Sequence, residues 1–251
     1  MFETLVNAFK VKEVRRKIFI TIGLLLVYRI GCFIPVPGLD YAAMKETIEG
    51  NVFLNIMSAL TGGSLAMGTL FAMGIGPYIN SSIIMQLLTV AIPPLERLQK
   101  EGEEGRKKIA QYTRIVTVLL AIIQAVGILL GSGDLLDTAI LPDAQWLLYT
   151  LVILIMVGGS SLTMWLGERI TEHGVGNGIS LLIFVGILST AGTAILNNFT
   201  LMSTGDLNAI WQFIGFIVAV VVIFGVIVYV DLAERKIPVQ YAKQVKGRKM
   251  Y

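Results

Sequence analysis

Six apolar windows along the chain are close to the length that a membrane-spanning helix needs. An α-helix crosses the hydrocarbon core of a bilayer with about 20 residues, most of them apolar. The windows cover residues 18–33, 69–92, 115–130, 146–166, 179–196 and 210–230. This pattern predicts an all-α fold, a polytopic membrane helix bundle with about six transmembrane helices.

A further apolar segment, residues 53–65, is too short and too polar to span a bilayer by itself. It contains Asn55, Ser58 and the pair Gly62-Gly63. Backbone that is not helical is tolerated at membrane depth only inside protein or beside water. We therefore expect a short re-entrant helix at 53–65, lying in a cavity. A spanning helix over 69–92 follows, and Pro77 allows it to bend.

The composition agrees with a membrane protein. Hydrophobic residues make up 55% of the chain and charged residues 15%, and the mean hydropathy is +0.76. These values lie outside the usual range of soluble domains. The first window follows a basic stretch, but no small-residue cleavage site comes after it, so we interpret it as a retained span.

Lysine and arginine collect on one side of the predicted bundle. Of the 20 basic residues, 18 lie before the first window, after the second, after the fourth or after the sixth, and the other two are Arg29 and Lys45. The positive-inside rule therefore places the N-terminus and the tail in the cytoplasm. The asymmetry can reflect topology alone or docking of an anionic partner. Arg29 is the one charged residue inside a predicted span, near an end from which it can reach lipid headgroups.

Few side chains suit catalysis or metal binding. The chain has one cysteine, Cys32, and one histidine, His173, too few for a disulfide framework or a Cys/His metal cluster. No GxxxxGK[ST] phosphate loop occurs, so an energy source would come from another protein. We expect no enzymatic activity, no cofactor and no metal.

The predicted spans carry uncharged polar residues instead. Asn80, Gln86 and Gln124 need protein or water partners, because an unpaired amide in hydrocarbon is costly. Buried carboxylates of the kind that ion-coupled transport uses are not evident in the spans. From the residues alone the alternatives are a passive channel, a small-solute secondary transporter or a non-conducting helical scaffold.

Four ordered segments resemble the SecY family, the pore-forming subunits of bacterial protein-translocation channels. The segments are VYRIGCFIPVPG, LTGGSLAMGTLFAMGIGPYINSSIIMQLLTVAIPPLERLQKEGEEGRKKIAQYTR, MWLGERITEHGVGNGISLLIF and ERKIPVQYAKQVKGRKMY. They run from the first predicted span to the last residue. The resemblance implies half of an inverted-repeat ten-span channel, with five spans, the sixth, and part of the next loop.

The resemblance also implies roles for individual residues. The plug, which closes the external funnel, corresponds to Phe53, Leu54, Ile56, Met57, Leu60, Gly62, Gly63 and Leu65. The pore ring of apolar side chains corresponds to Ile75, Ile79, Ile179 and Ile183. The lateral gate corresponds to Asn80, Gln86 and Gln124. The cytoplasmic partner-binding surface corresponds to Arg106, Lys107, Lys108, Lys243, Arg248 and Lys249.

As function, the resemblance implies the central subunit of a channel in the bacterial cytoplasmic membrane. Such a channel passes unfolded secretory polypeptides and releases hydrophobic segments, including signal sequences, into the lipid bilayer. The implied partners are SecE-like and SecG-like small membrane subunits, the motor ATPase SecA and the ribosome. The expected divisions are a cytoplasmic amphipathic N-terminus at 1–17, a five-span half at 18–197, an external loop and sixth span at 198–230, and a basic cytoplasmic loop from 231–251.

Overall fold

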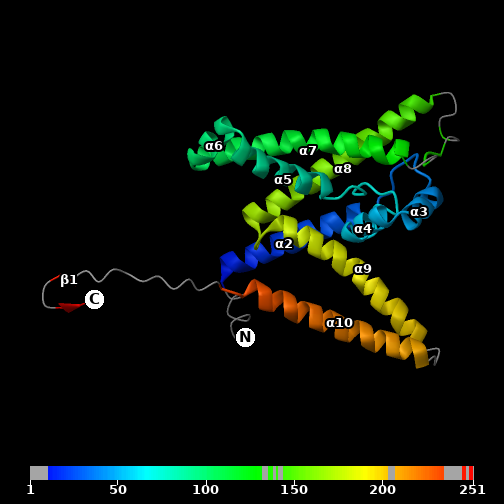
Figure 1. The fold of residues 1–251 in the computed structure, drawn as a ribbon. Coiled ribbons are helices and arrows are strands. Elements are labelled where there is room, and N and C mark those ends of the chain that lie inside the picture. Colours follow the sequence, from blue (N-terminus) through cyan, green and yellow to red (C-terminus); the bar gives the residue numbers. More distant parts are fainter. Residues whose placement is uncertain are drawn as a thin grey trace. The chain divides into compact units, whose positions relative to one another are not determined.

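Helices make up nearly all of the regular structure (Figure 1). The computed structural model describes residues 11–131, 135–137, 140, 144–202, 207–234, 245–246 and 249–250. The helices are α2 (Lys12–Gly31), α3 (Tyr41–Gly50), α4 (Val52–Leu60), α5 (Gly76–Ala91), α6 (Pro93–Lys100), α7 (Glu103–Gly131), α8 (Gln145–His173), α9 (Gly178–Met202) and α10 (Leu207–Asp231). Two-residue strands β1 (Val245–Lys246) and β2 (Lys249–Met250) pair antiparallel. The predicted all-α helix bundle is confirmed.

The chain divides into two compact units. They are Met1–Thr193 and Ala194–Tyr251. In the second unit no residue of the apolar window of α10 is buried. The surface of α10 is therefore apolar and open to lipid or to other protein.

The six apolar windows each overlap a helix, but the helices differ in length and apolarity. Three of those described, Glu103–Gly131, Gln145–His173 and Ile210–Asp231, are long and apolar enough to cross a membrane. A fourth crossing results if α5 and α6 form one span, bent by 99°. In α9 the described apolar helix is the shorter Gly178–Thr193. The chain is thus a multi-pass membrane protein, and spans at α2 and α9 stay predictions.

Prolines explain the bend between α5 and α6. Pro93 and Pro94 begin α6, directly after the α5 cap residue Ile92. A proline ring clashes with the preceding turn and removes a backbone donor, so α5 ends before this pair. Figure 1 shows α6 at the end of α5 that is far from α4.

Helix α7 packs between α5 and α8 through small side chains. Buried Thr113, Thr117, Ala121 and Ala125 recur every fourth residue along α7 and so share one face. The buried Ser81 hydroxyl of α5 donates a hydrogen bond of 2.8 Å to the Thr113 carbonyl oxygen. Small residues let the helix backbones approach closely, which is how membrane helices associate.

Residues 61–75, between α4 and α5, form successive turns rather than a helix. The predicted helix over 69–92 is therefore wrong at its start, because helix α5 begins at Gly76. Gly74 has a φ of +53°, which a right-handed helix cannot contain. Pro77 lies in the first helical turn, where its missing N–H costs nothing, and it produces no bend.

Backbone hydrogen bonds tie this turn segment to the loop that follows α2. The Val36 N–H donates to the Gly68 carbonyl oxygen at 2.9 Å, and the Leu70 N–H donates to the Ile34 oxygen at 2.8 Å. In this way backbone groups without helical partners are satisfied inside the protein, as hydrocarbon surroundings require.

Two short helices with side-chain caps precede the turn segment. Asp40 accepts a hydrogen bond from the Ala42 N–H at 2.8 Å and starts α3, a helix that the sequence analysis did not predict. Asn51 accepts one from the Phe53 N–H at 3.0 Å and starts α4. Helix α4 ends at Leu60, so only the first part of the predicted re-entrant segment is helical.

Two adjacent glycines in α8 test how closely α8 packs against the turn segment, residues 61–75. A methyl group on Gly159 would lie 1.8 Å from the Leu70 carbonyl oxygen, whereas one on Gly158 meets nothing within 4 Å. Gly159→Ala should lower the free energy of unfolding by about 1–3 kcal/mol, because α8 and the turn segment must separate. Gly158→Ala should raise it by up to about 1 kcal/mol through helix propensity. Thermal unfolding in detergent measures both, and equal effects would contradict the packing described.

Candidate functional site

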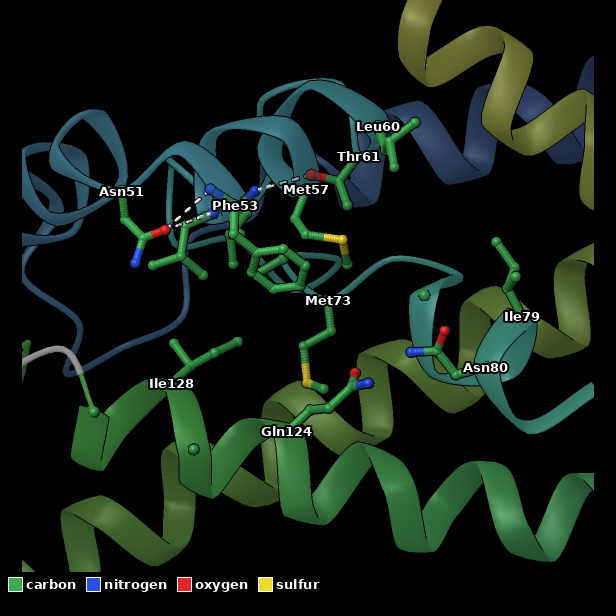
Figure 2. A pocket seen from close by; sticks show the side chains of 16 residues that line it. Asn51, Phe53, Met57, Leu60, Thr61, Met73, Ile79, Asn80, Gln124 and Ile128 are labelled. Atoms are coloured by element: carbon green, nitrogen blue, oxygen red, sulfur yellow. Dashed lines mark hydrogen bonds between the residues drawn. The ribbon is translucent and has the colours of Figure 1, made fainter. Parts of the chain in front are cut away.

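A cavity of about 550 Å³ lies between α4, the turn segment, α5 and α7. Its described lining is apolar except for four polar residues, Asn51, Thr61, Asn80 and Gln124. Of the predicted plug, the cavity is lined by Phe53, Leu54, Met57, Leu60 and Leu65. In Figure 2, Phe53 and Met57 extend from α4 toward the side of the cavity that Met73 and Ile128 form. The short helix thus faces a space inside the bundle.

Three of the predicted plug residues, Ile56, Gly62 and Gly63, do not line the cavity, whereas Leu65 lines it from the surrounding core. Ile56 is exposed, and Leu65 is buried in the apolar core that α3, α7 and α8 share. Gly62 has a φ of +70° and lies against Gly186 of α9. Gly63 has open space where a side chain would be.

A second, smaller cavity of about 60 Å³ collects three of the four predicted ring residues. Ile75, Ile79 and Ile183 line it, and the plug residues Met57 and Leu60 line it too. Ile75 precedes the first turn of α5 and Ile79 lies in that turn, while Ile183 comes from the second turn of α9. Side chains from helices about 100 residues apart in sequence therefore meet beside α4, the predicted plug.

The fourth predicted ring residue, Ile179, is in the first turn of α9 and is half-buried. It packs against the same apolar core as Ile75, and it does not line the small cavity. A methyl group on Gly167 of α8 would lie 3.2 Å from the Ile179 Cγ1 atom. Packing against α8 is therefore part of the environment of Ile179.

The predicted gate residues separate into two places. Asn80 and Gln124 both line the large cavity, from α5 and α7 respectively (Figure 2). Gln86 lines a third cavity of about 250 Å³, with Gln99 of α6 and Arg106 of α7. Gln86 therefore lies toward α6, in a different cavity from Asn80 and Gln124.

The predicted partner-binding residues are partly outside the described chain. Lys243 and Arg248 lie outside it, and Lys249 belongs to β2. Arg106, Lys107 and Lys108 are exposed in the first turns of α7. Within the part of the chain that the structure describes, neither Lys107 nor Lys108 forms an ion pair.

Arg29 does not reach toward headgroups as the sequence analysis expected. Its Nη2 atom donates a hydrogen bond of 2.6 Å to the Ser189 hydroxyl of α9, and its Nη1 atom is buried. The guanidinium also lies over the Phe33 ring, 5.4 Å from the centroid. The side chain is therefore directed between α2 and α9, because polar partners are available there.

Sequence analysis missed several residues that line these cavities. Leu182 lines the small cavity, and the spacing 179, 182, 183, 186 on one helical face was a signal that could have identified it. Tyr28 lines the same cavity and stacks on Phe71 with ring centroids 5.5 Å apart. Nothing in the sequence pattern indicated that contact.

This arrangement offers apolar surfaces that disfavour water and ions, and space for an apolar occupant. Uncharged side chains line both cavities among the described residues, and their polar groups are the amides of the large cavity, the Thr61 hydroxyl shared by both cavities and the Tyr28 hydroxyl of the small one. Apolar constrictions exclude water and ions because they offer no hydrogen bonds. The described residues contain no group of three or more His, Cys, Asp or Glu that could hold a metal ion.

The fold and the site define a multi-pass membrane helix bundle in which a short helix, α4, lines a small cavity together with apolar side chains from the starts of α5 and α9. The chain belongs to the SecY family, whose model matches residues 69–251. The protein translocase subunit SecY of Streptomyces scabiei is 41% identical over 263 residues, covering 100% of this chain and 60% of that protein. The SecY subunit of Staphylococcus carnosus is 40% identical over 254 residues, covering 100% and 59%. The chain spans about three-fifths of the length of these curated relatives.

Solved structures share the fold. A protein-conducting channel is similar with a TM-score of 0.57 and 21% identity, covering 94% of this chain and 52% of that one. Sec61 in the canine ribosome–channel complex of the endoplasmic reticulum has a TM-score of 0.56 and 22% identity, covering 89% and 49%. A SecY structure that concerns the plug domain has a TM-score of 0.56 and 23% identity, covering 94% and 52%.

Thiol labelling tests whether the plug region is re-entrant. Helix α4 has nine residues, a length of about 14 Å, which is half of what a span needs. Single cysteines placed along 52–65, with Cys32 replaced by serine, should be reached by a membrane-impermeant maleimide from one side only. A stretch of spanning length that no reagent reaches from either side would contradict the prediction.

Proposed function

We propose that the chain forms part of the central pore of a protein-conducting channel in the cytoplasmic membrane of a bacterium. In this proposal the pore passes unfolded secretory polypeptides and releases hydrophobic segments sideways into lipid. Membership of the SecY family favours this function over small-solute transport or a non-conducting scaffold. The chain itself is a passive conduit, and a motor ATPase like SecA or a ribosome supplies direction.

One observation carries the proposal: plug and ring side chains line the same small cavity. Met57 and Leu60 of α4 lie there with Ile75, Ile79 and Ile183. A constriction of branched apolar side chains seals against ions, because it gives no hydrogen bonds to replace a hydration shell. Apolar contacts are also non-directional, so the same ring does not select one polypeptide sequence over another.

We assign the plug role to α4 and the turns that follow it. The similar SecY structure is described as one whose plug domain stabilises the closed state of the channel and maintains a membrane seal. In this chain α4 is joined to α5 by 15 residues without helix, which allows it to move without unwinding a span. Displacement of α4 would open the small cavity to the large one, since Met57 and Leu60 line both.

We assign the lateral gate to the side of the large cavity that carries Asn80 and Gln124. Polar contacts between membrane helices are worth only about 1 kcal/mol each, which suits a seam that opens and closes. The volume of about 550 Å³ and the apolar lining are compatible with a segment of a hydrophobic signal sequence. Gln86 lies farther along α5 and would act at the cytoplasmic end of the seam.

The partners follow from the distribution of charge. Exposed Arg106, Lys107 and Lys108 are proposed to contact a motor ATPase or a ribosome, and the basic tail that holds Lys243, Arg248 and Lys249 is proposed as a separate contact with either. The N-terminus is then cytoplasmic. SecE-like and SecG-like subunits would cover exposed apolar helix surface such as that of α10. Sec61, similar in fold, was solved in a ribosome–channel complex.

Ion leak through the reconstituted natural protein tests the ring. Replacing Ile79 and Ile183 together with serine should raise resting conductance, because a wider and wettable constriction no longer excludes water. Single-channel recording measures the leak, and polypeptide transport into vesicles measures the activity.

The matched control is Ile153→Ser. Ile153 is a half-buried isoleucine of α8 that packs against the other apolar core. It should lower stability, by roughly 1 kcal/mol or more, without adding conductance. If the ring variant loses stability in the same way and conducts no better than the control, the pore assignment is wrong.

Charge reversal tests the cytoplasmic surface. Changing Lys107 and Lys108 to glutamate should slow motor- or ribosome-dependent transport at least about tenfold and leave stability within about 1 kcal/mol, because exposed charges affect recognition more than folding. Lys45→Glu is the control, since Lys45 is an exposed lysine on the opposite predicted side. Normal transport in the double variant would support the interpretation of these charges as topology signals alone.

A further inference from the structure

We propose that Arg29 is the positioning residue that holds the plug closed, by placing its guanidinium group at the C-terminal end of α4. The inference rests on the proposed function of α4 as a plug and extends it to a residue of α2, outside both plug and ring. It assigns a role to the one charged side chain that the sequence places inside a span.

The contacts of Arg29 place it between the plug and α9. Its Nη2 atom is fixed by the Ser189 hydroxyl, which accepts a hydrogen bond of 2.6 Å. Its Nη1 atom is buried and has no hydrogen-bond partner in the protein. That atom lies 3.0 Å from the position that a side-chain carbon on Gly62 would occupy. The second nitrogen therefore sits directly against the turn that ends the plug helix.

Two glycines bring plug and α9 into backbone contact beside this guanidinium. A methyl group on Gly186 of α9 would lie 2.7 Å from the Leu60 carbonyl oxygen. A methyl group on Gly62 would lie 3.0 Å from the Gly186 carbonyl oxygen. The Thr190 hydroxyl adds a long hydrogen bond of 3.5 Å to the Ala59 oxygen. The end of α4 thus fits closely against α9 at the level of Arg29.

Electrostatic attraction favours the position of α4 beside Arg29. The last carbonyl groups of a helix carry a partial negative charge, and a nearby cation stabilises them. Among the described residues no carboxylate forms an ion pair with Arg29. A cation at membrane depth needs compensation, so Arg29 depends on Ser189, the Phe33 ring and the end of α4. Moving α4 away removes part of that compensation, and the closed position is favoured.

The rate at which a buried thiol in the plug reacts measures how often α4 leaves its place. Ser58 of α4 is 6% exposed, so Ser58→Cys in a Cys32→Ser background is a nearly isosteric reporter. In native membrane vesicles, Arg29→Gln should raise the maleimide reaction rate at position 58 about tenfold, the effect expected from removing a partly buried cation from the C-terminal end of a helix. Arg29→Lys, which keeps the charge but cannot form the same fork of donors, should give an intermediate rate.

A second reporter separates a plug effect from a general loss of structure. Ser160→Cys in α8, at 1% exposure, reports opening of the bundle away from the plug, and its rate should not change. Arg169→Gln is the matched arginine control, because Arg169 also lies over an aromatic ring, Trp165, at 5.5 Å. It should change neither rate.

Each outcome decides the inference. If both reporters react faster in Arg29→Gln, or neither does, Arg29 does not position the plug. If Arg29→Gln does not accumulate in the membrane, Ser189→Ala removes only the hydroxyl partner and should raise the rate at position 58 about threefold. An increase at position 58 in a protein that transports no polypeptide would leave the role of Arg29 standing and overturn the proposed function instead.

Discussion

The arrangement of the first unit depends on one constraint, that backbone polar groups at membrane depth must find partners within the protein. Residues 61–75 leave helical geometry, so those N–H and carbonyl groups that their local turns do not pair would be unsatisfied in lipid. Two residues of the loop after α2 provide hydrogen-bond partners for this segment: Val36 pairs with Gly68, and Ile34 pairs with Leu70. This backbone pairing fixes the starting point of α5. It thereby also fixes Ile75 and Ile79, which line a cavity with Met57 and Leu60 of α4.

The sequence was a good guide wherever hydrophobicity or proline decides local structure. The long helices α7, α8 and α10 follow from apolar windows, and the end of α5 follows from Pro93. The turns before α5 could not be predicted in the same way, because their residues are as apolar as a span. What keeps them out of a helix is a positive φ at Gly74 and pairing with a loop about 30 residues away. Neither leaves a trace in a hydropathy pattern.

The candidate site shows the same division. The short polar, glycine-containing segment indicated a re-entrant element from the residues alone, whereas the ring residues came from family resemblance. Asn80 and Gln124 meet at one cavity while Gln86 does not, because α5 turns its far end toward α6 and α7. For Arg29 the position in the span was visible, but the direction of its side chain depends on Ser189, 160 residues away. Long-range partners of this kind are set by tertiary packing.

The bend of 99° between α5 and α6 has a mechanical consequence. Helix α6 projects sideways from α5 as a stiff arm of eight residues, about 12 Å long, and it packs on α7 as well. The Ser81–Thr113 hydrogen bond joins α5 to α7. A partner that pushes on α6 would therefore act on both α5 and α7. These two helices carry Asn80 and Gln124 at the large cavity.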